Sequence, residues 1–142
     1  MRRFTRMCLL TVSLTTAAFP ISAEDSRELV QMPERMQAHM LENMRDHLAA
    51  LNEIITSMVN GEWNQASEIA EWRLGMSSLE GHGAKHMSKH MPDGMRAVGL
   101  SMHRAASRLS LRAEEADPDP AYAALAEVTA ACVACHSSYR IR

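Results

Sequence analysis

The chain has 142 residues, with 15 lysines and arginines against 17 aspartates and glutamates, so its formal charge at neutral pH is −2. This length allows one domain with a short appendage. A slightly acidic chain lacks the basic surface with which proteins bind nucleic acid or anionic membranes, and no apolar run approaches membrane-spanning length.

The first 23 residues have the pattern of a secretory signal peptide. Three arginines precede an apolar stretch over 7–19, and Ala23 supplies the small residue at the cleavage site. Cleavage after Ala23 would leave 119 of the 142 residues, and the loss of the three arginines would change the formal charge from −2 to −5. Cys8 would be removed as well. The sequence therefore predicts an exported, periplasmic domain over 24–142 without membrane insertion.

Two helices are predicted in the first half of this domain. Apolar residues recur every three or four positions over 34–59, which is typical of an amphipathic helix. Pro33 suits its first turn and Gly61 its end. A second helix is predicted over 63–79, followed by glycines.

Two further helices are predicted in the second half. The third covers 95–115, and the fourth covers 121–139, with Asp119 as its N-cap and Pro120 as its first helical residue. No alternating β pattern occurs. Four helices joined by short loops predict an all-α fold, an antiparallel four-helix bundle. The 12 methionines of the chain would suit a core that adapts to a large flat ligand.

The fourth predicted helix carries the sequence Cys132-Val133-Ala134-Cys135-His136, which is typical of a c-type haem attachment site. Cys132 and Cys135 would bind the two vinyl groups of the porphyrin, and His136 would be the proximal iron ligand. On a helix this spacing places all three on neighbouring faces of one turn. The alternatives are a thioredoxin-like redox pair or half of a zinc site. The chain has no βαβ pattern for the first and no further cysteine, after loss of Cys8, for the second. One covalent haem c is therefore predicted.

A haem motif on the last helix of an exported four-helix chain resembles the class II cytochromes c, the cytochrome c-prime family. The residues Tyr139 and Arg140 follow the histidine as they do in that family. The resemblance implies a monohaem cytochrome that carries single electrons between redox partner proteins. It also implies that Arg140 lies near the haem, and it makes a homodimer a candidate assembly. The sequence contains no pattern of a hydrolytic triad, a phosphate loop or a paired-carboxylate site, so no enzyme activity is expected.

The family divides over the sixth iron ligand. Low-spin members use a methionine of the first helix, whereas high-spin members leave this face open and bind nitric oxide or carbon monoxide. Four methionines recur at steps of four, which advance about 40° around a helix, so they cannot all face one iron: Met32, Met36, Met40 and Met44. The sequence from Met40 to Arg45 is similar to the low-spin pattern. Met40 is therefore the predicted ligand, with Met36 second and His39 third; without any of them, gas binding is the alternative function.

A second candidate metal segment covers 82–95. Its histidines are spaced by four and alternate with methionines, a pattern that on a continuous helix would bind copper, nickel or zinc: His82, His86 and His90 with Met87, Met91 and Met95. Glycines and Pro92 weaken the helix, which favours a solvated connector over the hypothesis of a copper-binding protein. His47 and His103 lie within predicted helices and are expected to be partly buried or surface residues.

Overall fold

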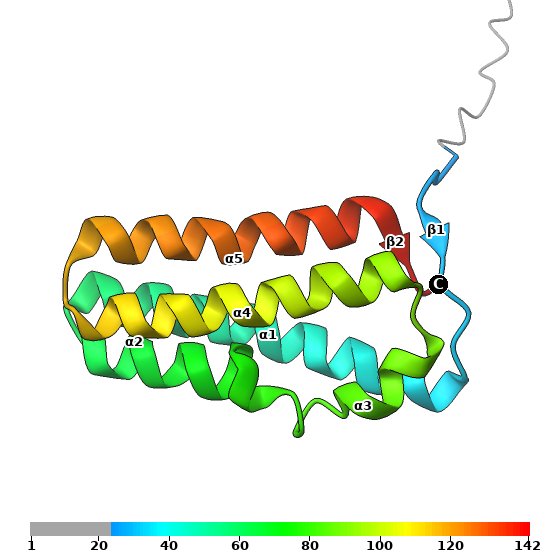
Figure 1. Ribbon diagram of the computed structural model, residues 1–142, viewed down its shortest axis with the longest axis horizontal. Helices are drawn as coiled ribbons and strands as arrows, with labels where there is room; N and C mark the ends of the chain where they lie inside the picture. The colour runs from blue at the N-terminus through cyan, green and yellow to red at the C-terminus, as the bar shows by residue number, and fades with distance from the viewer. Residues whose placement is uncertain (1–23) are drawn as a thin grey trace, which may run out of the picture.

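The computed structural model describes residues 24–142, and the predicted signal peptide lies outside the described residues. The described chain is mostly helical with one minimal pair of strands, so the all-α prediction is confirmed. The long helical segments lie side by side, and the two chain ends of the described part meet at one end of the molecule (Figure 1).

The longest helix, α1 (Glu34–Asn60), agrees with the first predicted helix almost to the residue. Its end is set by Gly61, whose φ of 75° lies in the left-handed region that favours glycine. The Gly61 N–H donates to the carbonyl of Met58 at 3.2 Å, and the Glu62 N–H donates to that of Ser57 at 2.8 Å. This Schellman pattern satisfies carbonyls of the last turn that would otherwise have no partner.

The second helical segment changes its winding twice. It begins as α2 (Trp63–Ile69), continues as the π-helical turn η1 (Ala70–Leu74), and resumes after Gly75 as the 3₁₀ turn η2 (Met76–Ser78). The prediction of one uninterrupted second helix is therefore wrong at Gly75, whose backbone is extended. A Cβ atom at Gly75 would lie 2.7 Å from the backbone carbonyl oxygen of Glu71, so only glycine allows this close approach.

The connector, residues 79–92, joins the second segment to the next long helix. It contains two short turns, α3 (Ala84–Met87) and η3 (Ser88–His90). Gly83, directly before α3, has a φ of 64°, which interrupts any helical path from the second segment. Met87 is buried, whereas most of the connector is exposed or half-buried. The expected irregular connector is confirmed.

The last two long helices are α4 (Asp93–Glu114) and α5 (Pro118–Ser138). The N-cap of α5 is Asp117, whose Oδ1 accepts a hydrogen bond from the N–H of Asp119 at 3.3 Å. The prediction that Asp119 caps this helix is thus wrong by two residues. Asp117 can satisfy the N–H two residues on, and Pro118 suits the first helical position.

The chain leaves α5 in an extended conformation, so the predicted fourth helix ends one residue earlier than expected. β2 (Tyr139–Arg140) pairs in parallel with β1 (Glu28–Leu29), with Glu28 opposite Tyr139 and Leu29 opposite Arg140. The Val30 N–H extends the pairing by donating to the Arg140 carbonyl at 2.8 Å. The pair fastens the beginning of the described chain to its end (Figure 1).

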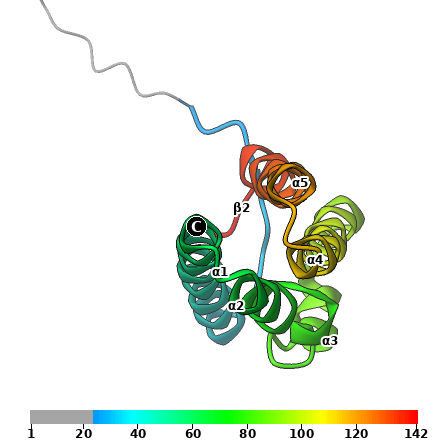
Figure 2. The same cartoon turned by 90° about the vertical axis from the view of Figure 1, so that its left-hand side faces the viewer.

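Packing is closest between α4 and α5, between α2 and α4, and between α1 and α2. α1 and α5 are not among the closely packed pairs, although Figure 2 shows them as neighbours in the end-on view. The largest fully buried side chains come one from each long segment: Ile54, Leu74, Leu109 and Val128. The main core therefore lies along the axis between the four segments.

Candidate functional site

The haem-type motif lies in the last two turns of α5, at the end of the molecule where β1 and β2 pair. Cys132 and Cys135 are free thiols and half-buried, and His136 is exposed. Burial raises the pKa of both thiols, and the neighbouring Cys132 raises that of Cys135 further. Both groups are therefore protonated at neutral pH. A thiol redox pair reacts through an accessible thiolate, so these surroundings do not favour a redox pair.

The two cysteines contact different apolar clusters. Cys132 packs against the main core between the four long segments. Cys135 packs against a second group, the methionine cluster, whose buried members are Val30, Met32, Met40, Met87 and Met95. The side chains that pack on it are partly buried: Met36, Met44, Met91, Cys135, Tyr139 and Ile141. The motif thus lies at the border between the core and a separate methionine-rich region.

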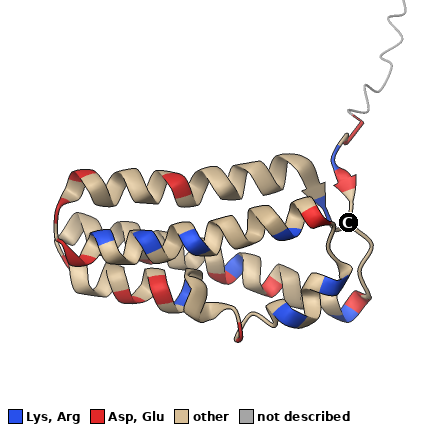
Figure 3. Ribbon diagram, viewed as in Figure 1, with Lys and Arg blue, Asp and Glu red and all other residues tan. Residues whose placement is uncertain are grey.

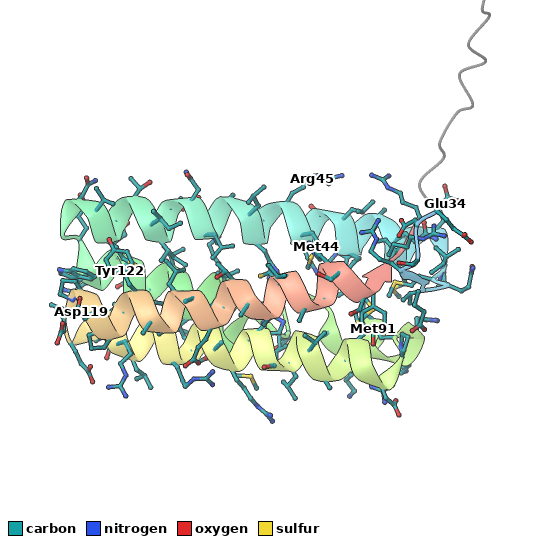
Figure 4. All side chains as sticks on the ribbon, turned by 90° about the horizontal axis from the view of Figure 1, so that it is seen from above. Glu34, Met44, Arg45, Met91, Asp119 and Tyr122 are labelled. Carbon is teal, nitrogen blue, oxygen red and sulfur yellow. The ribbon has the colours of Figure 1, made fainter. Side chains whose placement is uncertain are left out.

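The methionine cluster brings the motif and α1 together. Met40 is 6% exposed and belongs to the same cluster as Cys135, while Met36 and Met44 are partly buried against it. Met44 lies on the side of α1 that faces α5, and Arg45 points away (Figure 4). Met36 and Met40 therefore share the methionine cluster with Cys135 of the motif, although they lie far from it in sequence.

His39 is directed to a different neighbour. Its Nε2 lies 3.1 Å from the carbonyl oxygen of His82 in the connector, and the same oxygen accepts a hydrogen bond from Nδ2 of Asn43 at 3.0 Å. Because a carbonyl oxygen only accepts, His39 must donate from Nε2 in this contact. This nitrogen would have to leave its partner before it could bind a metal.

Arg140 lies beside the motif with an incompletely satisfied guanidinium. Its buried Nε has no hydrogen-bond partner among residues 24–142. The nearest opposite charge is Oδ2 of Asp25, at 3.5 Å. A buried donor without a partner costs about 1–3 kcal/mol. The position is therefore suited to an additional anionic group, such as a carboxylate.

The second half of α5 carries little charge. Within Pro118–Ser138 the only acidic residues are Asp119 and Glu127, and the helix contains no lysine or arginine. Residues 128–138 include no lysine, arginine, aspartate or glutamate, and the end of the α5 ribbon next to β2 is tan in Figure 3. The part of α5 that carries the motif therefore has no charged side chain before Arg140, which follows the helix.

The histidines of the connector do not form the ladder that their spacing suggested. Residues 79–83 form turns, and His86 and His90 are exposed. Met87 and Met95 instead pack into the methionine cluster. Within the part of the chain that the structure describes, no three histidine, cysteine or acidic side chains are placed to hold a metal ion.

His82 belongs instead to a cluster that sequence reasoning missed, the histidine cluster of His47, His82 and His103. The ring centroids of His47 and His82 are 4.8 Å apart, and that of His103 lies 5.9 Å and 5.6 Å from them. Nδ1 of His103 donates to the Leu74 carbonyl at 2.7 Å. The Ser78 hydroxyl lies 3.3 Å from Nδ1 of His82 and 3.4 Å from that of His103.

Burial sets the protonation state of this cluster. Burial and the two neighbouring histidines together lower the pKa of His47 to about 4, with burial the largest cause. The pKa values of His82 and His103 are also lowered, mainly by burial. All three rings are therefore neutral at pH 7. Their spacing in sequence gave no signal, because the contact depends on the path of the connector.

An open groove of about 700 Å³ lies between α1 and the connector. Its lining contains none of the motif residues: Arg35, Met36, Ala38, His39, Glu42, Gly83, His86 and Met87. Met36 and Met87 connect it to the methionine cluster. The groove therefore adjoins that cluster, and Cys135 is not part of its lining.

Comparisons with protein-family models, with curated proteins and with solved structures found no match to the chain. Among residues 24–142 no helix is long and apolar enough to cross a membrane. The function therefore has to be inferred from the residues of the site themselves.

Proposed function

We propose that this chain is a periplasmic monohaem cytochrome of the class II type, an antiparallel four-helix bundle that carries single electrons between redox partner proteins. The observation that carries the proposal is the methionine cluster, because it contains both Cys135 of the motif and Met40 of α1. A proximal histidine and a methionine from opposite helices are a ligand pair typical of electron-transfer cytochromes.

The residues present fit a haem c. Cys132 and Cys135 are unbonded thiols one helical turn apart and would hold it by two thioethers. His136 follows directly and would be the proximal ligand. The Nε–H of Arg140, which has no partner, would donate a hydrogen bond to a propionate carboxylate of the haem. When bound, the haem supplies a reversible one-electron couple of its iron.

The chain's own side chains would set the surroundings of that group. Val30, Met32 and Met95 are at most 7% exposed and would keep water away from the Met40 side. An apolar shell of this kind lowers the local dielectric constant, which tunes a redox potential. A thioether ligand from Met40 would raise it.

Absorption spectra of the protein, exported with its haem-attachment system, test the proposal. Oxidised and reduced samples are recorded with and without carbon monoxide. A low-spin spectrum unaffected by carbon monoxide would support methionine ligation and electron transfer. A high-spin spectrum that shifts with carbon monoxide would replace this function by gas binding. Absence of a haem spectrum would overturn the proposal altogether.

A further inference from the structure

The segment 25–32, here called the strap, lies across the end of α5. It pairs with β2 through β1, and its Val30 and Met32 are buried in the methionine cluster. Figure 1 shows β1 next to β2, at the end of α5 that carries the motif. The strap therefore contacts β2 through its backbone and the methionine cluster through its side chains.

One residue of the strap contacts the motif itself. Nη1 of Arg27 donates to the backbone carbonyl of His136 at 3.3 Å, across 109 sequence positions. This carbonyl is one of the last four of α5, which have no partner within the helix. A cation at this helix end also interacts favourably with the helix dipole. Arg27 is thus a cap for α5, supplied by the opposite end of the described chain.

The guanidinium of Arg27 is itself held in place. Asp25 accepts two hydrogen bonds from it, at 2.9 Å from Nε and at 2.7 Å from Nη2. The Arg27 side chain holds the pKa of Asp25 well below its usual value, so this carboxylate is ionised at neutral pH. Asp25 also lies 3.5 Å from Nε of Arg140. One carboxylate therefore links the cap of α5 to the arginine that follows the motif.

We propose that Arg27 is a positioning residue for the candidate iron ligand His136. Fastened by Asp25, it fixes the last turn of α5, and through the His136 carbonyl it restricts the backbone from which the imidazole projects. The inference rests on the proposed function, because only a bound haem gives that orientation a consequence. Bidentate contact to Asp25 with one further bond to a carbonyl uses the fork geometry of arginine, which lysine lacks.

The experiment compares Arg27→Ala, Arg27→Lys and the control Arg35→Ala. Arg35 is exposed in the first turn of α1, so the control removes the same charge near the same end of the molecule. Amide hydrogen exchange is measured over 136–141 in each full-length exported protein. The midpoint potential and the reduced spectrum are recorded on the same samples.

Arg27→Ala should increase exchange over 136–141 by about fivefold, the effect of losing one net hydrogen bond. It should also shift the midpoint potential from that of the wild type. Arg27→Lys should restore the exchange only in part, and Arg35→Ala should change neither quantity. Faster exchange with an unchanged potential and spectrum would make Arg27 a structural cap only and overturn the positioning role. Unchanged exchange would overturn the cap as well.

The two proposals fail in different ways. If the wild-type protein has no haem spectrum, the proposed function is wrong and the positioning role falls with it. If the wild type has the expected spectrum and the Arg27 variants have the same amide exchange, midpoint potential and spectrum as the wild type, the proposed function stands and the inference about Arg27 is wrong.

Discussion

The imidazole rings of His47 and His82 lie 4.8 Å apart, although one belongs to the middle of α1 and the other to the connector. Nε2 of His47 is 3.5 Å from Nδ1 of His82. Together with the bonds of His39 and Asn43 to the His82 carbonyl, this contact fixes the connector to one face of α1. If both rings became imidazolium cations, two positive charges would lie side by side in a largely buried position.

Stability should therefore fall on mild acidification. The native pKa of His47 is about 4, below its unfolded value of 6.5, so the unfolded state binds more protons between these values. The contribution of neutral His47 to the free energy of unfolding is complete above pH 6.5 and is lost as the pH falls towards 4. We expect a loss on the order of 2 kcal/mol from His47 between pH 7 and pH 4.5. Denaturant unfolding at a series of pH values measures it.

The variant His47→Leu should have a flatter pH dependence than the wild type, and His90→Gln, an exposed connector histidine, should keep the wild-type curve. Of the charged groups near the cluster, Asp46 raises the pKa of His47 and Arg73 lowers it. Asp46 stays ionised in this range because Arg73 lowers its pKa. A wild-type curve that is flat from pH 7 to pH 4.5 would contradict this account.

The break in the second segment depends on the missing side chain of Gly75. A Cβ atom there would lie 2.7 Å from the Glu71 carbonyl oxygen, a backbone atom that cannot rotate away. We expect Gly75→Ala to lower the free energy of unfolding by about 1–3 kcal/mol. Thermal unfolding monitored by circular dichroism measures the change.

Gly99→Ala is the matched substitution within a helix. Gly99 lies inside α4, and apart from its chain neighbours and the nearby backbone of its own helix no atom lies within 4 Å of the position that an added Cβ atom would occupy. Alanine should therefore stabilise the protein by about 0.5–1 kcal/mol. We therefore expect the free energy of unfolding to fall on substitution of Gly75 and to rise on substitution of Gly99. Equal effects would show that Gly75 is not confined by Glu71.

The sequence predicts the helices well where local signals define them. Gly61 ends α1 as expected, since only glycine adopts its φ of 75° at little cost. The break at Gly75 was missed because the apolar spacing continues through it. The two strands were missed because two residues each give no periodic signal, and the pairing arises only when both ends of the described chain meet.

In the candidate site, too, features defined by local sequence are predicted and features that depend on distant contacts are not. The motif of Cys132, Cys135 and His136 is visible in sequence, because its spacing is local. The partners of the histidines are not, since Gly83 turns the connector and places His82 against α1 and not in line with His86. Arg27 was missed for a similar reason. Its only local signal is Asp25 two residues earlier, and its contact with the motif spans 109 positions.

Tyr139 packs over the first turn of α4 at a glycine. A Cβ atom at Gly94 would collide with the Tyr139 hydroxyl, while the ring carbon Cζ would remain at 3.6 Å, an ordinary contact. We expect Gly94→Ala to cost about 1–3 kcal/mol of stability, because the ring must move. The double variant Gly94→Ala with Tyr139→Phe should recover most of this loss, since phenylalanine has no hydroxyl. A double-mutant cycle of unfolding free energies measures the coupling, and additive losses would contradict the contact.

The identity of the distal ligand can be tested within the methionine cluster. Met40 is 6% exposed, whereas Met36 and Met44 are only partly buried on the same helix, so the three offer matched substitutions. If Met40 binds the iron, Met40→Ala alone should give a high-spin spectrum that responds to carbon monoxide and a lower midpoint potential. Met36→Ala and Met44→Ala should keep the low-spin spectrum and lose stability only.

Loss of packing would affect Met40→Ala too, at about 2–5 kcal/mol, so stability alone cannot separate the roles. Met40→Leu keeps the volume and removes the sulfur, and it should cost less than about 1.5 kcal/mol while still opening the iron to carbon monoxide. A low-spin, unresponsive Met40→Leu protein would exclude Met40 as ligand. If Met36→Leu then became responsive, the ligand would lie one turn earlier on α1, where Met36 borders both the methionine cluster and the groove beside the connector.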